Sequence, residues 1–251
     1  MQRLPLLMGA LVTASVTIAG PVTTTTHADA PNPPICEVTG NYYDGGYTLR
    51  SQSIYGARAL IDKTNNPVFC PDLGTTWATV LVGSNICAAG GITFHAQVGT
   101  GIVQGHSRDV VTEWTKKCCG QPECDDPFVR HYRHNAPSGP LEYEVYQRTD
   151  GYVVMRAGGN VVDVTGYNVS GDWDTAWTDQ FFGETWDLPT YMPGVSSSKV
   201  RFQELQRYES NGDINYIQTG DLYWMAPQPN YERDQVPNDP HPAFRIWDSR
   251  G

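Results

Sequence analysis

The stretch Leu141–Thr185 decides the fold that the sequence predicts, because strand and turn signals follow one another closely in it. It opens with LEYEVYQR at 141–148, turns at Asp150-Gly151, and returns as YVVMRA at 152–157. Tyr and Val fit a pleated surface, and Asp-Gly between two such runs is a strong hairpin signal. A second glycine-rich turn leads into VVDV at 161–164. We therefore predict three antiparallel strands here.

The same stretch ends in a candidate for chemistry. A polar loop, GDWDTAW at 171–177, leads into QFFGET at 180–185, where Glu184 stands among large apolar rings. A carboxylate in such surroundings loses solvation, which raises its pKa and suits it to general acid or base work. The alternative is a half-buried strand with Glu184 facing water.

Composition indicates an all-β protein. The chain has 251 residues with 14 Tyr, 7 Trp, 25 Gly and 18 Pro, and runs of helix-forming residues are nearly absent. The net charge of -10 argues against nucleic acid or an anionic membrane as a partner. We expect a monomer.

The first thirty residues have the pattern of a secretory signal peptide. Arg3 precedes an apolar run that is too short for a comfortable membrane span, and small residues mark cut sites after Ala28 or Ala30. We therefore expect an exported protein in three parts: a signal peptide at 1–30, a β-sandwich domain at 31–225, and a loosely ordered tail at 226–251.

Six cysteines lie beyond this segment, at positions 36, 70, 87, 118, 119 and 124. An even number in an exported chain favours disulfides, although six cysteines allow 15 pairings. Neighbouring Cys118 and Cys119 should serve different partners. No Cys or His spacing resembles a structural zinc site, so we expect neither a metal nor a cofactor.

The remaining chain reads as further strands, about ten in total, and no helix, which favours a single antiparallel β-sandwich or jelly roll. The strand at 92–98 alternates cleanly. Ile92, Phe94, Ala96 and Val98 should face the core, while Thr93, His95 and Gln97 form a polar row on the other face.

Six segments also match a known order of motifs, over residues 55–208. They are YGARA at 55–59, ITFHAQV at 92–98, Trp114 with a Cys-x4-Cys loop, YEVY at 143–146 through Gly159-Asn160, FGE at 182–184, and VRFQELQ at 200–206. In this order they resemble the neprosin-like family of glutamic peptidases, which are secreted β-sandwich enzymes.

The resemblance implies a site. It places the family's second catalytic Glu at Glu184, the first at Thr93, and a disulfide between Cys119 and Cys124. Thr93 is not a carboxylate, but Gln97 lies four residues on, on the same face. Related glutamic peptidases use a Gln/Glu pair. Glu184 would then activate a water, with Gln97 or His95 stabilising the developing charge.

Aromatic residues close to Glu184 in sequence complete the predicted site. Trp173, Trp177, Trp186 and Tyr191 could grip a substrate, as Thr93 could, or could be ordinary core. Three functions stay open: a secreted glutamic-type peptidase, weak or inactive without its first carboxylate; a non-catalytic module that binds carbohydrate or peptide; and an exported interaction protein with no site.

Overall fold

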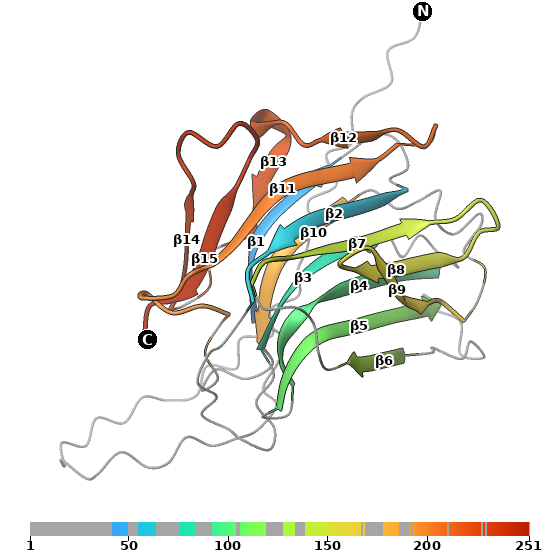
Figure 1. Cartoon of the computed structure of the whole chain (residues 1–251), viewed down its shortest axis with the longest axis horizontal. Coiled ribbons are helices and arrows are strands. Elements are labelled where there is room, and N and C mark those ends of the chain that lie inside the picture. Colours follow the sequence, from blue (N-terminus) through green and yellow to red (C-terminus); the bar gives the residue numbers. More distant parts are fainter. Residues whose placement is uncertain are drawn as a thin grey trace, which may run out of the picture. The chain divides into compact units, whose positions relative to one another are not determined.

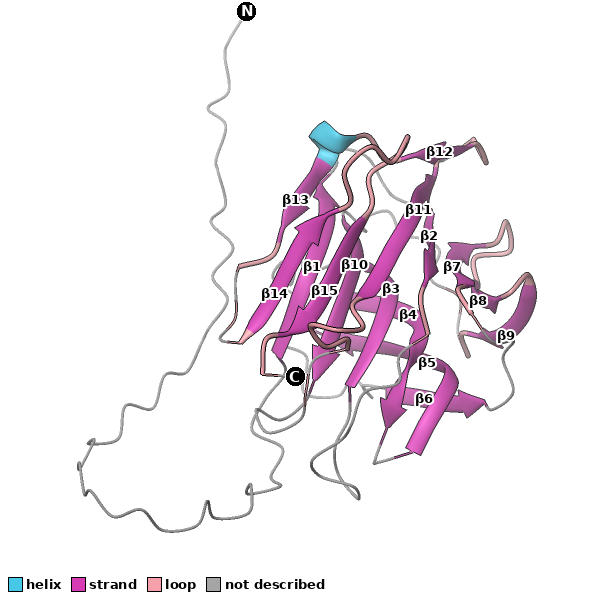
Figure 2. Ribbon diagram, turned by 60° about the vertical axis from the view of Figure 1, so that its left-hand side comes forward, coloured by secondary structure: helices cyan, strands magenta, loops and turns pink. Residues whose placement is uncertain are grey.

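The computed structural model describes residues 42–49, 55–63, 76–83, 92–103, 106–118, 128–133, 139–166, 168, 178–185, 191, 193–209, 211–226, 228 and 230–250. Nearly all of the regular structure in this part of the chain is β-strand (Figure 2). The exception is one 3-10 turn, Thr219–Asp221. No helix in the described residues is long and apolar enough to cross a membrane.

Seven strands form the first sheet, which we call sheet A, and every pairing in it is antiparallel (Figure 1). In spatial order they are β13 (Leu222–Trp224), β1 (Tyr42–Leu49), β10 (Thr178–Thr185), β3 (Thr76–Gly83), β4 (Ile92–Val103), β5 (His106–Cys118) and β6 (Phe128–Arg133).

Eight strands form sheet B, again with antiparallel pairings. In spatial order they are β14 (Tyr231–Gln235), β15 (Phe244–Asp248), β11 (Val200–Tyr208), β2 (Gly56–Ile61), β7 (Leu141–Gln147), β8 (Val153–Ala157) and β9 (Asn160–Val164), with β12 (Ile214–Tyr216) paired to β11.

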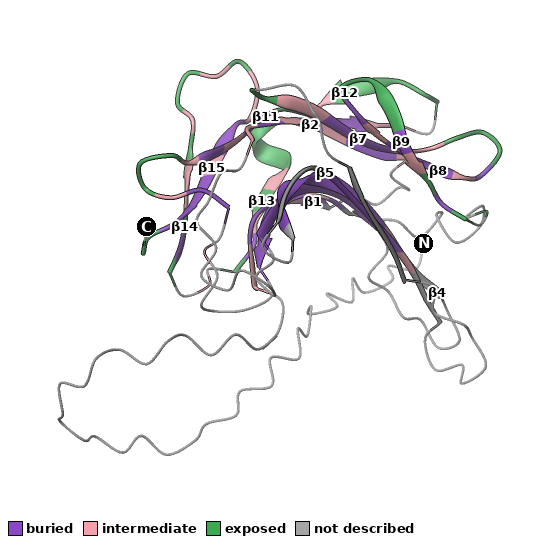
Figure 3. Ribbon diagram, turned by 60° about the horizontal axis from the view of Figure 1, so that its bottom comes forward, coloured by how far each residue is buried: buried purple, intermediate pink, exposed green. Residues whose placement is uncertain are grey.

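The two sheets pack face to face around one core, because alternate residues of each strand are apolar and point inward. In β2, Ala57, Ala59 and Ile61 are fully buried in this core. Ala96 and Val98 of β4 are buried there too, as their alternation predicts. Figure 3 shows that sheet A is strongly curved, with its convex side toward sheet B. Its concave face is therefore left for other contacts. The predicted antiparallel β-sandwich is confirmed.

The hairpins predicted at 141–164 form as β7, β8 and β9. Gly151, Gly158 and Gly159 all have positive φ angles, of 84°, 56° and 77°. Glycine adopts this left-handed region without the clash that a Cβ would cause, so these turns need glycine.

The C-terminal segment corrects a prediction. Residues 226–251 were expected to form a loosely ordered tail, but they contain β14 and β15, and β15 pairs with β11. Phe244 and Ile246 are fully buried in the main core. Pro237, Pro240 and Pro242 lie between β14 and β15, where they do not interrupt the pairing.

Candidate functional site

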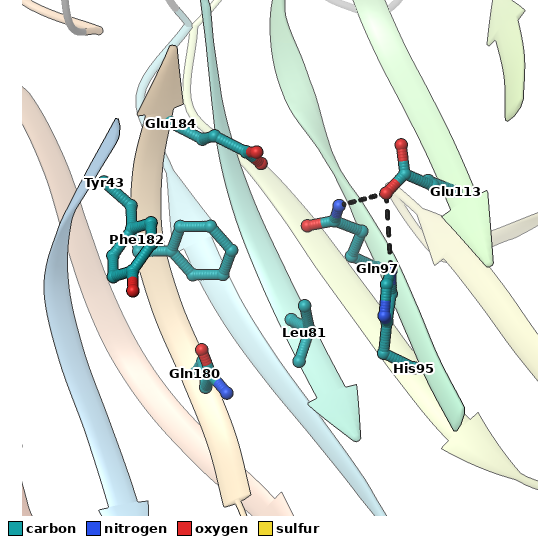
Figure 4. Close-up of a pocket in the computed structure, with 8 residues that line it drawn as sticks. All are labelled: Tyr43, Leu81, His95, Gln97, Glu113, Gln180, Phe182 and Glu184. Carbon is teal, nitrogen blue, oxygen red and sulfur yellow. Dashed lines mark hydrogen bonds and ion pairs between the residues drawn. The ribbon is translucent and has the colours of Figure 1, made fainter. Parts of the chain in front are cut away.

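A cavity of about 330 Å³ opens on the concave face of sheet A (Figure 4). Strands β1, β10, β3, β4 and β5 contribute to it, because in each of them the residues that alternate with the core residues point to this face. The described lining residues are Tyr43, Leu81, His95, Gln97, Glu113, Gln180, Phe182 and Glu184.

Glu184 lies on one side of this cavity. It shares a strand face with Phe182, while Phe181 between them is fully buried in the core. The Glu184 side chain is only 6% exposed, and its Oε2 accepts a hydrogen bond of 2.7 Å from Nε1 of Trp77 on β3. Trp77 is itself buried. The packed indole therefore fixes the position of the Glu184 carboxylate.

Gln97 and Glu113 lie on the other side, directly paired across β4 and β5. Nε2 of Gln97 donates a hydrogen bond of 2.9 Å to Oε1 of Glu113. Nε2 of His95 lies 3.3 Å from the same oxygen. Gln97 and Glu113 are 3% and 5% exposed, whereas the His95 side chain is 32% exposed. His95 thus connects a buried amide-carboxylate pair with solvent.

The second polar atom of the Gln97 side chain has no such partner. No hydrogen-bond donor in the described part of the chain reaches Oε1 of Gln97, although this atom is buried. A buried carbonyl oxygen without a hydrogen bond is costly by about 1–3 kcal/mol, so such an atom in a cavity indicates a place for a ligand or a water.

Glu184 and Glu113 face one another across the cavity without being neighbours in the sheet. Their strands are three positions apart, roughly 14 Å at about 4.8 Å per strand. Figure 4 shows the Glu184 side chain extending over the cavity toward Glu113 and Gln97. The concave curvature and the length of these side chains bring the polar groups together around a space that can hold a substrate group.

The wall on the β1 side is apolar. Leu81, Phe182 and Met225 form a buried cluster, against which Tyr43 and Tyr47 pack. The rings of Tyr43 and Phe182 meet edge to face with centroids 6.3 Å apart. The cavity therefore has an acidic, amide-bearing side on β4 and β5 and an aromatic side on β1 and β10, from which Glu184 and Gln180 also extend.

The predicted catalytic residues Glu184, Gln97 and His95 all line this cavity, and their chemical roles remain predictions. Thr93 lies in β4, but its side chain is outside the described set. Gly101 of β4 lies level with Glu184 of β10, because both residues pair with Trp77 of β3. Along β4, Thr93 is eight positions from Gly101, whereas Gln97 is only four positions from it.

The predicted aromatic contacts have different outcomes. Trp173, Trp177 and Trp186 lie outside the described residues. Tyr191 does not line the cavity: its hydroxyl donates to the Arg250 carbonyl oxygen at 3.3 Å, and the Arg250 guanidinium lies over its ring. The chain has by then left β10 and lies beside the end of β15, and the role of Tyr191 in substrate binding stays a prediction. Tyr43 and Phe182 line the cavity instead.

The disulfide prediction cannot be compared with the structure. Cys119 and Cys124 lie outside the described residues, and of Cys118 only the backbone is described, where it pairs with Ile92. Within the described set, no group of three or more His, Cys, Asp or Glu side chains could hold a metal ion.

Glu113 is the functional candidate that sequence reasoning missed. It is a second carboxylate in the cavity, on β5, whereas the resemblance directed attention to β4. The signal was present in the sequence: Val110, Thr112 and Trp114 alternate with Val111 and Glu113. Val110 and Trp114 are in the core, so Glu113 had to be on the concave face beside Gln97.

Comparisons with known proteins support the same fold. No protein-family model matches the chain, and no curated protein matches it in sequence. Among solved structures, scytalido-glutamic peptidase bound to a transition-state analogue inhibitor is similar with a TM-score of 0.50 and 13% identity. The match covers 84% of this chain and 100% of that one. The likeness shows a shared fold.

Two further structures are more distant. SCP-B, a member of the eqolisin family of peptidases in complex with the tripeptide Ala-Ile-His, has a TM-score of 0.49 and 11% identity, over 84% of this chain and all of that one. The kappa-carrageenase of Pseudoalteromonas carrageenovora, bound to an oligosaccharide, has a TM-score of 0.38 and 10% identity, over 81% and 68%.

Proposed function

We propose that this protein is an exported peptidase of the glutamic type, in which Glu184 activates a water for attack on a peptide carbonyl. One observation carries the proposal: a buried glutamate, fixed by an indole N–H, faces a carboxamide and a second glutamate across one cavity. The fold shared with glutamic peptidases supports it. Export and a neprosin-like relationship are parts of the proposal that rest on the sequence.

The reaction needs a base for the attacking water, a hydrogen-bond donor for the oxyanion, and a group that carries the proton to the leaving amine. The ionised Glu184 carboxylate takes a proton from water while the water oxygen bonds to the carbonyl carbon, and the carbonyl π electrons move to its oxygen. When that pair returns, the C–N bond breaks and Glu184 gives its proton to the leaving amine. A hydrogen bond to the transient oxyanion lowers the barrier.

The cavity walls favour a particular peptide. Phe182 stands two residues from Glu184 on the same strand face, beside Tyr43 and Leu81. A large apolar side chain next to the scissile bond would cover these groups, whereas an acidic one would meet Glu113 and Glu184. The oxygen of Gln97 suits the N–H of a peptide backbone. We therefore expect cleavage beside large apolar residues in extended, non-acidic segments.

A carbohydrate-binding or peptide-binding module without catalysis is the second candidate, and the aromatic side of the cavity favours it. Sugar rings stack on exposed aromatic faces, but Leu81, Phe182 and Met225 are nearly buried and offer an apolar recess instead. The hydroxyl groups of a sugar would lose hydration there, which makes a peptide side chain the better occupant.

The deciding experiment is digestion of a denatured protein from acidic to neutral pH by wild type, Glu184→Gln and Gln97→Ala, with cleavage sites read by mass spectrometry. We expect cleavage by wild type, strongest in acid, and almost none by Glu184→Gln. Equal cleavage by both proteins would remove Glu184 from the mechanism. Absence of cleavage at every pH, with retained binding to a peptide or glycan array, would favour the binding module.

A further inference from the structure

The Gln97 carboxamide has two different ends, and the structure shows which one is in use. The NH₂ end donates to Glu113, so the carbonyl oxygen is the end without a partner among the described residues. An oxyanion needs a hydrogen-bond donor, and a carbonyl oxygen is only an acceptor. In this arrangement, Gln97 cannot stabilise the oxyanion that the proposed reaction creates.

We propose that Glu113 is a positioning residue whose protonation decides which end of the Gln97 carboxamide faces the cavity. An ionised carboxylate only accepts, so it binds the NH₂ group and leaves the oxygen outward. A protonated carboxyl group has an O–H that donates to the Gln97 oxygen and leaves the NH₂ group outward. The two ends of an amide have nearly the same shape, so the cavity accommodates either orientation.

The inference rests on the proposed function and adds a reason for acid dependence. Below the pH at which Glu113 takes up a proton, the cavity presents a donor for the oxyanion. Above that pH it presents an acceptor, which suits a water or a substrate N–H but opposes the developing negative charge. Loss of one oxyanion donor typically costs about 10²–10³ in kcat, which would separate an active from an inactive form.

Other groups around Glu113 bias this equilibrium. His95 on β4 contacts the same carboxylate oxygen, and a proton on its imidazole would favour the ionised form of Glu113. Glu184 on β10 faces the cavity from the opposite side, and its negative charge would favour the protonated form. Arg130 on β6 pairs with Glu113 in backbone register. The pH of the transition reflects the charges of His95 and Glu184 together.

The test is the pH profile of Glu113→Gln with a peptide substrate that carries Phe beside the scissile bond. The introduced amide offers a donor and an acceptor at every pH, so Gln97 can turn its NH₂ group outward without a proton. We expect the variant to keep its acid-range kcat at pH 7, where wild type falls by about a hundredfold, with KM little changed. Glu142→Gln, at a half-exposed glutamate of sheet B, is the matched control and should follow wild type.

The opposite result overturns the inference. If kcat of wild type and Glu113→Gln declines by the same factor between acid and neutral pH, the protonation of Glu113 does not control the site. A Glu113→Leu variant completes the set. It cannot anchor either end of the amide, so its kcat should be reduced at every pH. An unreduced kcat for this variant would also contradict a positioning role.

A spectroscopic measurement separates this inference from the proposed function. The side-chain amide ¹⁵N–¹H signals of Gln97, identified by their loss in Gln97→Ala, should shift with pH in wild type and stay constant in Glu113→Gln. That result supports the switch even if no substrate is cleaved, in which case only the proposed function is wrong. Signals that behave alike in both proteins contradict the switch even if cleavage is observed.

Discussion

Two glutamates on different sheets show how the setting of a buried carboxylate determines its role. Glu144 of β7 is on the outer face of sheet B, where Nη1 of Arg156 lies 3.3 Å from its Oε2. Glu184 of β10 is buried to a similar degree, but the partner of its Oε2 is the neutral indole N–H of Trp77. A charged guanidinium pairs with Glu144, whereas an uncharged indole N–H orients Glu184 beside the cavity.

The wider surroundings of the two carboxylates also differ: Glu144 lies among charged side chains, and Glu184 lies beside a cavity. Near Glu144, Arg58 also approaches Glu142 at 3.5 Å, so charges of both signs alternate over this part of sheet B. Around Glu184 lie a cavity, an amide and aromatic rings. Ion-pair networks hold structures together, while a carboxylate beside a cavity and neutral donors is a candidate for chemistry.

The largest predicted difference is in activity. Glu184→Gln should lower kcat/KM on a peptide substrate by at least about a hundredfold, because the amide cannot take a proton from water. Glu144→Gln should leave kcat/KM unchanged within about twofold, since it does not approach the cavity. Comparable losses in both variants, measured on proteins with matching circular dichroism spectra, would mean that burial alone, and not the cavity, explains the effect.

The partner of Glu184 provides the next test. Trp77→Phe removes the indole N–H while keeping an aromatic ring, and should lower kcat by about tenfold with a smaller change in KM. It should also lower the free energy of unfolding by about 1–3 kcal/mol, because a buried hydrogen bond to a carboxylate is lost. Trp247→Phe in sheet B is the control and should retain wild-type kcat. Full activity of Trp77→Phe would show that the indole does not position Glu184.

The comparison of the two glutamates can also be tested through Glu144, whose protonation should make the free energy of unfolding depend on pH. Burial raises the pKa of Glu144 above its ordinary 4.5, and the charge of Arg156 only partly opposes this. The folded state therefore holds this proton more tightly than the unfolded chain does. The resulting stabilisation is complete below the unfolded pKa and is lost as the pH rises through the folded pKa.

The Glu144→Gln variant should not lose stability in this way as the pH rises, because its amide stays neutral. The free energy of unfolding of the variant, relative to wild type, should therefore rise between pH 4 and pH 7 when measured by urea denaturation. A relative stability that falls with pH would mean that the Arg156 pairing outweighs the burial of the charge. Asp44 and Asp62, whose pKa values burial also raises, should contribute to wild-type pH dependence in the same direction.

The smallest effect belongs to an exposed pair. Arg148 and Asp150 form an ion pair at the turn between β7 and β8, with side chains 48% and 44% exposed. Arg148→Gln should change the free energy of unfolding by no more than about 0.5 kcal/mol, because water screens such pairs. A loss above about 1 kcal/mol in urea denaturation would show that this turn depends on the ion pair.

The sequence predicted the strands with strong alternation and missed those defined by their partners. Ile92–Val98 shows its two faces directly, so Gln97 and His95 could be assigned to the concave side. Strand β1 reads YYDGGYTL, with two glycines in its middle, and it is a strand because β10 and β13 bind it on both edges. Likewise β15 extends only five residues, and its burial against β11 stabilises it.

The sequence could predict those site residues that are recognisable within one strand, but not those that reach the cavity only through the pairing of two strands. Glu184 was named because it stands out within its own segment, and Gln97 because it lies in the polar row of its strand and the resemblance to glutamic peptidases directed attention to that row. Glu113 was missed because its importance depends on the register of β5 against β4, which brings it opposite Gln97. Tyr43 was missed for the same reason, since it reaches the cavity only through the pairing of β1 with β10.

The hydrogen bond between Trp77 and Glu184 also has a consequence for the order of folding. These two residues are 107 positions apart in the chain, and they meet only when β10 pairs with β3. Contacts of such high sequence separation form late and slowly, because a long loop must first close. A chain that has folded only as far as β9 lacks Glu184, so the proposed site is incomplete. In the proposed peptidase, this timing would protect the nascent chain from its own activity.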